Sequence, residues 1–486
     1  MEQQNTLYSY IYQNLKKRIT SDHSFPGTQL PSARRLCEEY HAGIYTITRV
    51  LKALEEEGLI KTRPRQAPVI LALQKKNSET PEIITILEQR NSILQIFKTC
   101  ELLLPPLFAF ASRNCSLEMM PHYNQVMRVA RKGVSRGVWR ESSAFIKDIL
   151  KSCGNPLLCD LYANLQLHEN LSFFFEKCDF FKENFLKGSY AVTGQMIDIF
   201  RSNDSYKKYR EIKKLYQKLY LAVSDTIQHL MSSVSNCPAP ADIPFNWNPL
   251  RGKDYYYMRI VRDLIRKIGK GIFPVGTFLP FEAQLAKQYG VSVFTVRKAL
   301  DLLERRGYTK TLNAKGTMVL LPDDSHVSMA LSDLASKQDA LLYLHALQLM
   351  VLLAHPIAEC VVNRFQSEEL EFLSDIFQKK DFIHLTALFQ ATAEHLELKP
   401  LQDIFIETSR VTEWGFYLCY YPRSSATITQ LERLTFEAFR QLCDKNVLGF
   451  GEGLANCYRY ILNSVRAYML DKYNFNEGLS VRTPQI

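Results

Sequence analysis

The sequence predicts a mainly α-helical protein in which two small domains with short β wings alternate with two all-α helical bundles. A stretch at residues 30–62 returns without a gap 249 positions later, at residues 279–311. This spacing is too long for a solenoid and indicates a duplicated module. The tracts between and after the repeats are rich in Leu, Ile, Phe and Tyr and poor in glycine, which favours helical bundles. We expect small domains at residues 1–75 and 251–322, bundles at 80–235 and 326–480, and a proline-bearing linker at 236–250.

Length and composition indicate a soluble protein of several domains. A chain of 486 residues is too long for one hydrophobic core. It has no run of eighteen uncharged apolar residues, and its N-terminus lacks the basic start and apolar core of a signal peptide. The 11 cysteines include no C-x-x-C pair, which favours reduced thiols. We therefore expect a cytoplasmic protein without a membrane segment.

The net charge of +10 is concentrated in the two repeats. Residues 1–75 contain 11 basic and 7 acidic side chains, and residues 251–322 contain 14 and 5, so the rest of the chain is slightly acidic. A basic face is often only solvated. Positive charge confined to two copies of one module is, however, what binding to nucleic-acid phosphates favours.

Each repeat begins with two predicted helices. The first is amphipathic and is expected at residues 8–20 and 258–269. A proline-containing turn follows it, and the second, shorter helix is expected at residues 32–40 and 281–289.

A third helix, at residues 44–57 and 293–306, has the clearest periodicity. Its apolar side chains recur at i, i+3, i+4 and i+7, so one face is buried and the other is left to contact a partner. The buried stripe is expected to consist of Ile47, Val50, Leu51 and Leu54 in the first copy, and of Val296, Ala299, Leu300 and Leu303 in the second.

Each repeat is expected to end in a β-hairpin. Gly58 and Gly307 follow the third helices, where a left-handed C-cap is needed. In the second copy, residues 309–321 form two β-type runs around the turn Asn313-Ala314-Lys315-Gly316. The first copy has two prolines at residues 64–68, so its wing tip should differ in shape. Three helices and a hairpin describe a winged helix-turn-helix.

The repeats resemble the winged helix of GntR-type bacterial transcription regulators. The first copy offers Pro26-Gly27-Thr28-Gln29-Leu30-Pro31-Ser32, and the second offers Thr295-Val296-Arg297-Lys298-Ala299-Leu300 and Lys315-Gly316-Thr317-Met318-Val319. The bundles resemble, more weakly, the all-helical domain of the FadR-like subgroup, chiefly through residues 153–158. This resemblance implies a double-stranded DNA operator as partner.

The candidate DNA-binding residues lie on the exposed face of the third helix and around it. A helix in the major groove needs Arg or Lys for guanine edges and phosphates, Thr hydroxyls, and an aromatic ring for thymine methyls. The alternative is a solvated face. The candidates are Arg34, Tyr45, Thr46, Thr48, Arg49, Lys52 and Arg65 in the first copy, and Ser292, Phe294, Thr295, Arg297, Lys298, Lys315 and Gly316 in the second. Because the two sets differ, we expect the two copies to prefer different DNA sequences.

The bundles are expected to hold no metal and no cofactor. The resemblance implies an Asp and a His that bind metal in many relatives. Those positions are Ser142 and Ile146 in the first bundle and Thr386 and Gln390 in the second. An effector, if there is one, would be a small organic molecule in an apolar bundle cavity. Otherwise the bundles serve association alone.

The sequence does not indicate an enzyme. Some GntR-type chains carry an aminotransferase-like domain, but only 20 glycines occur in 486 residues, and no P-loop, G-x-S-x-G or H-E-x-x-H motif is present. We therefore expect a transcription regulator acting as an intramolecular pseudo-dimer or a homodimer on an imperfect palindrome. The alternative is an architectural DNA-binding protein without an effector.

Overall fold

The chain forms two compact units, each with one winged helix and one helical bundle. The first unit comprises Met1–Ser152, Cys159–Asn246 and Leu250–Lys253, and the second comprises Cys153–Leu158, Trp247–Pro249 and Asp254–Ile486. The computed structural model describes residues 8, 11, 12, 15, 16, 19, 29–40, 43–63, 66–71, 80–113, 115–132, 138–171, 173–186, 190–241, 244–249, 256–269, 271–322, 334–378, 384–417 and 425–485.

Winged helix 1 contains α2 (Ala33–Tyr40), α3 (Ile44–Glu56), β1 (Ile60–Lys61) and β2 (Val69–Ile70). The described residues of the predicted first helix are helical, and Ile11, Leu15 and Ile19 are buried in the same cluster as the apolar stripe of α3. All four predicted stripe residues of α3 are buried, as its periodicity predicts. The core of this domain is therefore built from the helix faces that the sequence indicates.

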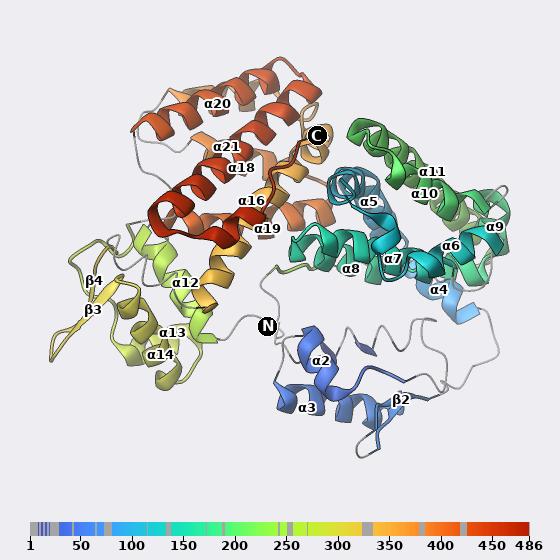
Figure 1. Ribbon diagram of the computed structural model, residues 1–486, viewed down its shortest axis with the longest axis horizontal. Helices are drawn as coiled ribbons and strands as arrows, with labels where there is room; N and C mark the ends of the chain where they lie inside the picture. Colours follow the sequence, from blue (N-terminus) through green and yellow to red (C-terminus); the bar gives the residue numbers. More distant parts are fainter. Residues whose placement is uncertain are drawn as a thin grey trace. The chain divides into compact units, whose positions relative to one another are not determined.

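Winged helix 2 contains α12 (Tyr256–Gly269), α13 (Glu282–Tyr289), α14 (Val293–Arg305), β3 (Thr309–Leu312) and β4 (Gly316–Val319), and Figure 1 shows the two strands as a hairpin beside α13 and α14. Helix α14 packs on α12 and α13, and its four predicted stripe residues are buried. The opposite face of α14 consequently faces away from the core.

Glycine ends the third helix of both copies, as predicted. Gly58 has φ +71° and Gly307 has φ +76°, which is the left-handed region that favours glycine. The wings that follow are antiparallel hairpins of different length. In winged helix 2 the pairing runs from Thr309 with Val319 to Leu312 with Gly316, whereas in winged helix 1 it is limited to Ile60 with Ile70 and Lys61 with Val69. Pro64 and Arg65, at the predicted tip of the first wing, lie outside the described residues.

Bundle 1 is all-helical, as expected. Its α5 packs along α11, and most of α5 is buried although it contains Pro105 and Pro106. Its elements are α4 (Thr80–Glu88), α5 (Arg90–Ala111), η1 (Leu117–Met119), α6 (Tyr123–Lys132), α7 (Val138–Ser152), α8 (Pro156–Glu169), η2 (Phe173–Lys177), α9 (Asp179–Leu186), α10 (Tyr190–Arg201) and α11 (Ser205–Ser233).

Bundle 2 is also all-helical. Helix α16 packs on α19 and α21, and α20 packs on α21. Its elements are α16 (Leu334–Val361), α17 (Ser367–Phe377), α18 (His384–Glu394), α19 (Lys399–Tyr417), α20 (Ser425–Cys443), α21 (Val447–Tyr473) and η3 (Asn476–Ser480).

Two bundle helices are long and apolar enough to cross a membrane by length and composition. They cover Arg90–Ala111 and Lys337–Val361, and 83% and 89% of their most apolar windows are buried within the fold. Such burial is typical of the central helix of a bundle, whose apolar surface contacts other helices on all sides.

A nearly buried charge cluster joins winged helix 2 to bundle 2 within the second unit. Asp339, on α16, forms an ion pair with Arg262 Nη2 at 3.4 Å and another with Arg306 Nη2 at 3.6 Å. The side chains of Arg262, Arg306 and Asp339 are only 10%, 7% and 13% exposed. Because Arg306 caps the C-terminus of α14, the cluster connects the predicted recognition helix directly to the bundle.

Bundle 1 contains a buried carboxyl group that should make its stability depend on pH. Burial raises the pKa of Glu169 from 4.5 to about 7, although Cys100 Sγ donates a hydrogen bond to it at 3.2 Å. A folded-state pKa above the unfolded value contributes stability that is present below the unfolded pKa and is lost as pH rises through the folded pKa. We expect the free energy of unfolding to fall by about 3 kcal/mol between pH values of ~4.5 and ~7 on account of this group.

Urea unfolding of Glu169→Gln across this pH window tests the expectation. The glutamine variant should lose that part of the pH dependence, while Glu118→Gln, at an exposed position, should keep it. An unchanged pH profile in Glu169→Gln would show that folding does not raise the pKa of Glu169.

Candidate nucleic-acid interface

The exposed face of α14 brings predicted DNA-binding residues together at its first two turns. Ser292 is the N-cap, and its Oγ accepts a hydrogen bond from Thr295 N at 3.2 Å. Phe294 is 76% exposed, and Arg297 and Lys298 are exposed as well. Thr295 is half-buried, with its Oγ1 2.9 Å from Ser292 Oγ. A helix N-terminus with adjacent cations suits a phosphate-bearing partner.

Arg297 is held in place by a carboxylate from the preceding helix. Arg297 Nε donates to Glu282 Oε2 at 2.7 Å, and the two side chains are 62% and 39% exposed. An exposed Arg ordinarily has many rotamers, and fixing it by one charge-assisted hydrogen bond reduces the entropy lost on binding. Since Nε is engaged by Glu282, a partner would be contacted through the two terminal nitrogens of the guanidinium.

Winged helix 1 lacks both members of this pair. Ala33 and Thr48 occupy the positions of Glu282 and Arg297 in the repeat. Thr48 Oγ1 donates to Ile44 O, at 2.8 Å, within its own helix. The sequence predicted Thr48 as a site residue but missed the orienting role of Glu282. The sequence did contain a signal for this role, because the carboxylate of Glu282 and the guanidinium of Arg297 are both replaced in the first copy.

A second feature missed from the sequence is common to both copies. The guanidinium of Arg49 lies over the ring of Tyr8, 4.8 Å from its centroid, and also 5.8 Å from that of Tyr45. Lys298 Nζ lies 4.2 Å from the ring centroid of Tyr257. Tyr8 and Tyr257 are equivalent positions of the repeat. A tyrosine of the first helix therefore orients the equivalent cation of the third helix by a cation–π contact in each copy.

The other predicted residues of winged helix 1 differ in exposure. Tyr45 is 74% exposed, Arg34 is exposed on α2, and Thr46 is half-buried. Lys52 is exposed and lies 3.7 Å from Glu56 Oε1. Arg65 lies outside the described residues.

The wing of winged helix 2 places Lys315 and Gly316 beside two exposed aromatic rings. Lys315 is exposed, and Gly316 has φ +109°. A Cβ at Gly316 would lie 3.6 Å from Phe278 Cδ1 and 3.8 Å from Phe281 Cε1. Phe281, at the N-cap of α13, is 68% exposed. Phe281 was not among the residues predicted from the sequence, and the first copy has Ser32 at this position.

The two positions of bundle 1 that the family resemblance implies for metal binding carry one hydroxyl and one apolar side chain. Ser142 Oγ lies 3.1 Å from Thr193 Oγ1, and Ile146 is 6% exposed. Within the described ranges, no group of three or more His, Cys, Asp or Glu side chains is arranged to hold a metal ion. The expectation of a metal-free bundle stays a prediction, which elemental analysis of the dialysed protein tests.

Glu282→Gln should reduce sequence discrimination more than affinity. The amide cannot ion-pair with Arg297, so the guanidinium regains its rotamers, while the net positive charge of the face increases. We expect binding to random duplex to be kept or strengthened and the ratio of specific to random affinity to fall by about ten-fold, the value of one oriented base contact. Competition binding at fixed salt measures this ratio. A ratio that stays at the parent value would show that Glu282 does not position Arg297 for readout.

A winged helix-turn-helix domain consists of three helices followed by a hairpin, and here the exposed face of the third helix is basic and aromatic. The chain has two such domains. The model of the gntR family of bacterial regulatory proteins matches residues 7–70 and 256–319. The chain therefore carries two winged-helix domains of the gntR family in tandem.

Individual relatives match parts of the chain. The HTH-type transcriptional regulator TreR of Bacillus subtilis (strain 168) is 39% identical over 64 residues, which are 13% of this chain and 27% of TreR. The match thus spans about a quarter of that relative. A Streptococcus agalactiae GntR structure aligns with 43% of this chain and 99% of its own, at 18% identity and a TM-score of 0.21. The E. coli McbR/YncC structure aligns with 46% and 99%, at 16% identity and a TM-score of 0.22.

Proposed function

We propose that this protein is a cytoplasmic, sequence-specific regulator of transcription that binds double-stranded DNA through both winged helices. The observation that carries the proposal is the pair of gntR-family domains, each with cations oriented on the exposed face of its third helix. The concentration of positive charge in these two domains supports it, because phosphate neutralisation supplies much of the affinity for DNA. The chain has no proposed catalytic role.

The two winged helices are proposed to read unlike half-sites. Winged helix 2 presents Arg297 oriented by Glu282, which suits a guanine edge in the major groove. Winged helix 1 presents Tyr45 and Arg49 with no guanidinium at the position of Thr48. Because the two faces differ in donors and in aromatic surface, one half-site cannot satisfy both equally.

The duplication also bears on assembly. Helix-turn-helix proteins commonly bind as two-fold dimers whose recognition helices meet half-sites about 34 Å apart. A chain that already holds two winged helices and two bundles has the parts for such an arrangement as an intramolecular pseudo-dimer, and a homodimer would hold four winged helices. We propose an imperfect palindrome as the operator in either case.

Selection of duplexes from a random library by the full chain, followed by footprinting and light scattering of the complex, tests the proposal. We expect two unlike half-sites with centres about one helical turn, ~10 base pairs, apart. Enrichment of a single symmetric site would contradict unlike half-sites. Binding without any sequence enrichment would favour an architectural DNA-binding protein instead.

A further inference from the structure

Bundle 1 contains a cavity at the C-terminal end of its long helix α5. Its volume is about 410 Å³, which is within the range of small-molecule sites, roughly 300–1,000 Å³. The end of α5 and the junction of α10 with α11 form its walls. The lining includes Ser112, Arg113, Cys115, Glu118, Arg201 and Lys208.

The lining has three cations and one carboxylate, and the most buried cation is Lys208. Lys208 is 4% exposed, and its Nζ donates to Ser112 O at 2.9 Å and to Ser112 Oγ at 3.1 Å. Burial lowers the pKa of Lys208, and the group that opposes this shift is the Cys115 thiol rather than a carboxylate. A buried ammonium beside a cavity favours an anionic neighbour.

Arg201 forms a second, positioned side of the cavity. Its Nη2 donates to Tyr123 OH at 2.8 Å, and its Nη1 lies 3.3 Å from Asp198 Oδ1. These contacts hold the guanidinium at the end of α10. Arg113 follows the C-terminus of α5 directly, so the cations of the lining come from three different segments.

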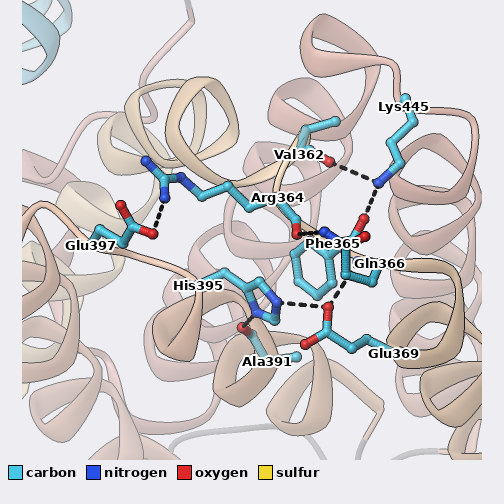
Figure 2. A network of polar contacts seen from close by, with 9 residues as sticks. All are labelled: Val362, Arg364, Phe365, Gln366, Glu369, Ala391, His395, Glu397 and Lys445. Atoms are coloured by element: carbon cyan, nitrogen blue, oxygen red, sulfur yellow. Dashed lines mark hydrogen bonds and ion pairs between the residues drawn. The ribbon is translucent and has the colours of Figure 1, made fainter.

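Bundle 2 has a lysine in a similar place, close to the C-terminal end of its long helix α16. Lys445 Nζ donates to Val362 O at 3.4 Å and to Phe365 O, at the C-terminal end of α16 (Figure 2). Glu369 faces this region and accepts hydrogen bonds from Gln366 N at 2.8 Å and from His395 Nε2 at 3.0 Å.

The electrostatics of this network agree with its geometry. The Gln366 N–H and the His395 side chain hold the pKa of Glu369 below its usual value, and Lys445 contributes in the same direction. The His395 ring is stacked on Phe365 with centroids 3.9 Å apart, which fills the space beside the carboxylate. In bundle 2 a carboxylate of the chain thus lies within electrostatic range of this lysine.

Each bundle therefore places a lysine on backbone carbonyls just after the C-terminus of its long central helix, where cations are favoured by the helix dipole. In bundle 2 the charge of Lys445 helps to lower the pKa of Glu369, whereas in bundle 1 Lys208 lines an open cavity together with Arg113, Arg201 and one carboxylate, Glu118. We infer that the cavity of bundle 1 binds the oxyanion group, phosphate or carboxylate, of a small organic anion. The polar lining differs from the apolar effector cavity expected from the sequence. The role of this cavity as an effector site rests on the proposed regulatory function, whereas the binding of an anion in the cavity does not.

Calorimetric titration of the full chain with inorganic phosphate and with succinate, at ionic strength matched with chloride, tests this inference. We expect saturable binding of at least one anion with one site per chain, and the anion that binds distinguishes a phosphate from a carboxylate ligand. Arg113→Gln should weaken it by about ten-fold or more, because the variant cannot make a charged hydrogen bond to the anion. Lys208→Met should also weaken it, whereas Lys218→Met, at an exposed position of the same helix, should not.

If Lys208→Met destabilises the end of α5, Arg113→Gln still tests whether the cavity binds an anion. Absence of saturable binding for both anions, or equal affinity in the parent and Arg113→Gln, overturns the inference. Duplex binding measured on the same preparations separates the two proposals. A chain that binds its duplex but neither anion refutes the anion site alone, and a chain that binds an anion but no DNA refutes the proposed function alone.

Discussion

Replacing Arg297 and Lys298 by alanine is expected to weaken binding of the full chain to its selected duplex by about 1–3 kcal/mol for each base or phosphate interaction that the alanines remove. Both cations lie on the exposed face of α14, and both are held there, by Glu282 and by the Tyr257 ring. Fluorescence anisotropy titrations at physiological salt measure the change. The effect should be larger on the selected duplex than on random DNA, because an oriented guanidinium reads bases as well as phosphates.

A matched control removes the same charge from other positions of winged helix 2. Arg305 lies in the last turn of α14 and Lys310 lies in β3, and both are exposed. Their double alanine variant should weaken binding slightly and equally on all duplexes, through electrostatics alone. If the Arg297 and Lys298 variant binds as tightly as the parent, α14 is not the recognition helix.

Winged helix 1 should depend in the same way on Arg34 and Arg49. Arg49 is oriented by Tyr8 and Tyr45, so its replacement by alanine should again reduce sequence discrimination. The base preference affected should differ from that of winged helix 2, since Thr48 and Ala33 replace the Arg297 and Glu282 pair.

Asp339→Ala is expected to destabilise the second unit by about 3–5 kcal/mol, the cost of breaking a buried ion pair by removing one partner. The substitution leaves the nearly buried guanidinium groups of Arg262 and Arg306 without the carboxylate that both contact. Urea unfolding followed by circular dichroism measures the destabilisation. Asp301→Ala, at an exposed position of α14, serves as the control and should change stability by less than about 0.5 kcal/mol.

This substitution also tests the connection between α14 and bundle 2. Because Arg306 caps α14, removal of the Asp339 carboxylate should loosen winged helix 2 from α16 before the bundle itself unfolds. If Asp339→Ala unfolds at the same urea concentration as the parent, the charge cluster is solvated and contributes little to stability.

Local sequence determined the elements of this protein. The stripes of α3 and α14 were predicted residue by residue, because a 3.6-residue period decides which side chains share a helix face. Gly58 and Gly307 were predicted as left-handed caps because few other residues adopt that backbone conformation. The duplication, the two winged helices and the helical nature of the bundles also follow from pattern alone.

Only the tertiary structure decided how the side chains of different elements meet. Glu282 orients Arg297 from a separate helix, and Tyr8 of the first helix reaches Arg49 of the third. The cavity of bundle 1 depends on Arg113, Arg201 and Lys208, and Arg113 is far from the other two in the sequence. Periodicity specifies the face on which a side chain lies but not its distance from a side chain on another helix. That distance is fixed by how the helices pack, and the charge pairs and the cavity follow from it.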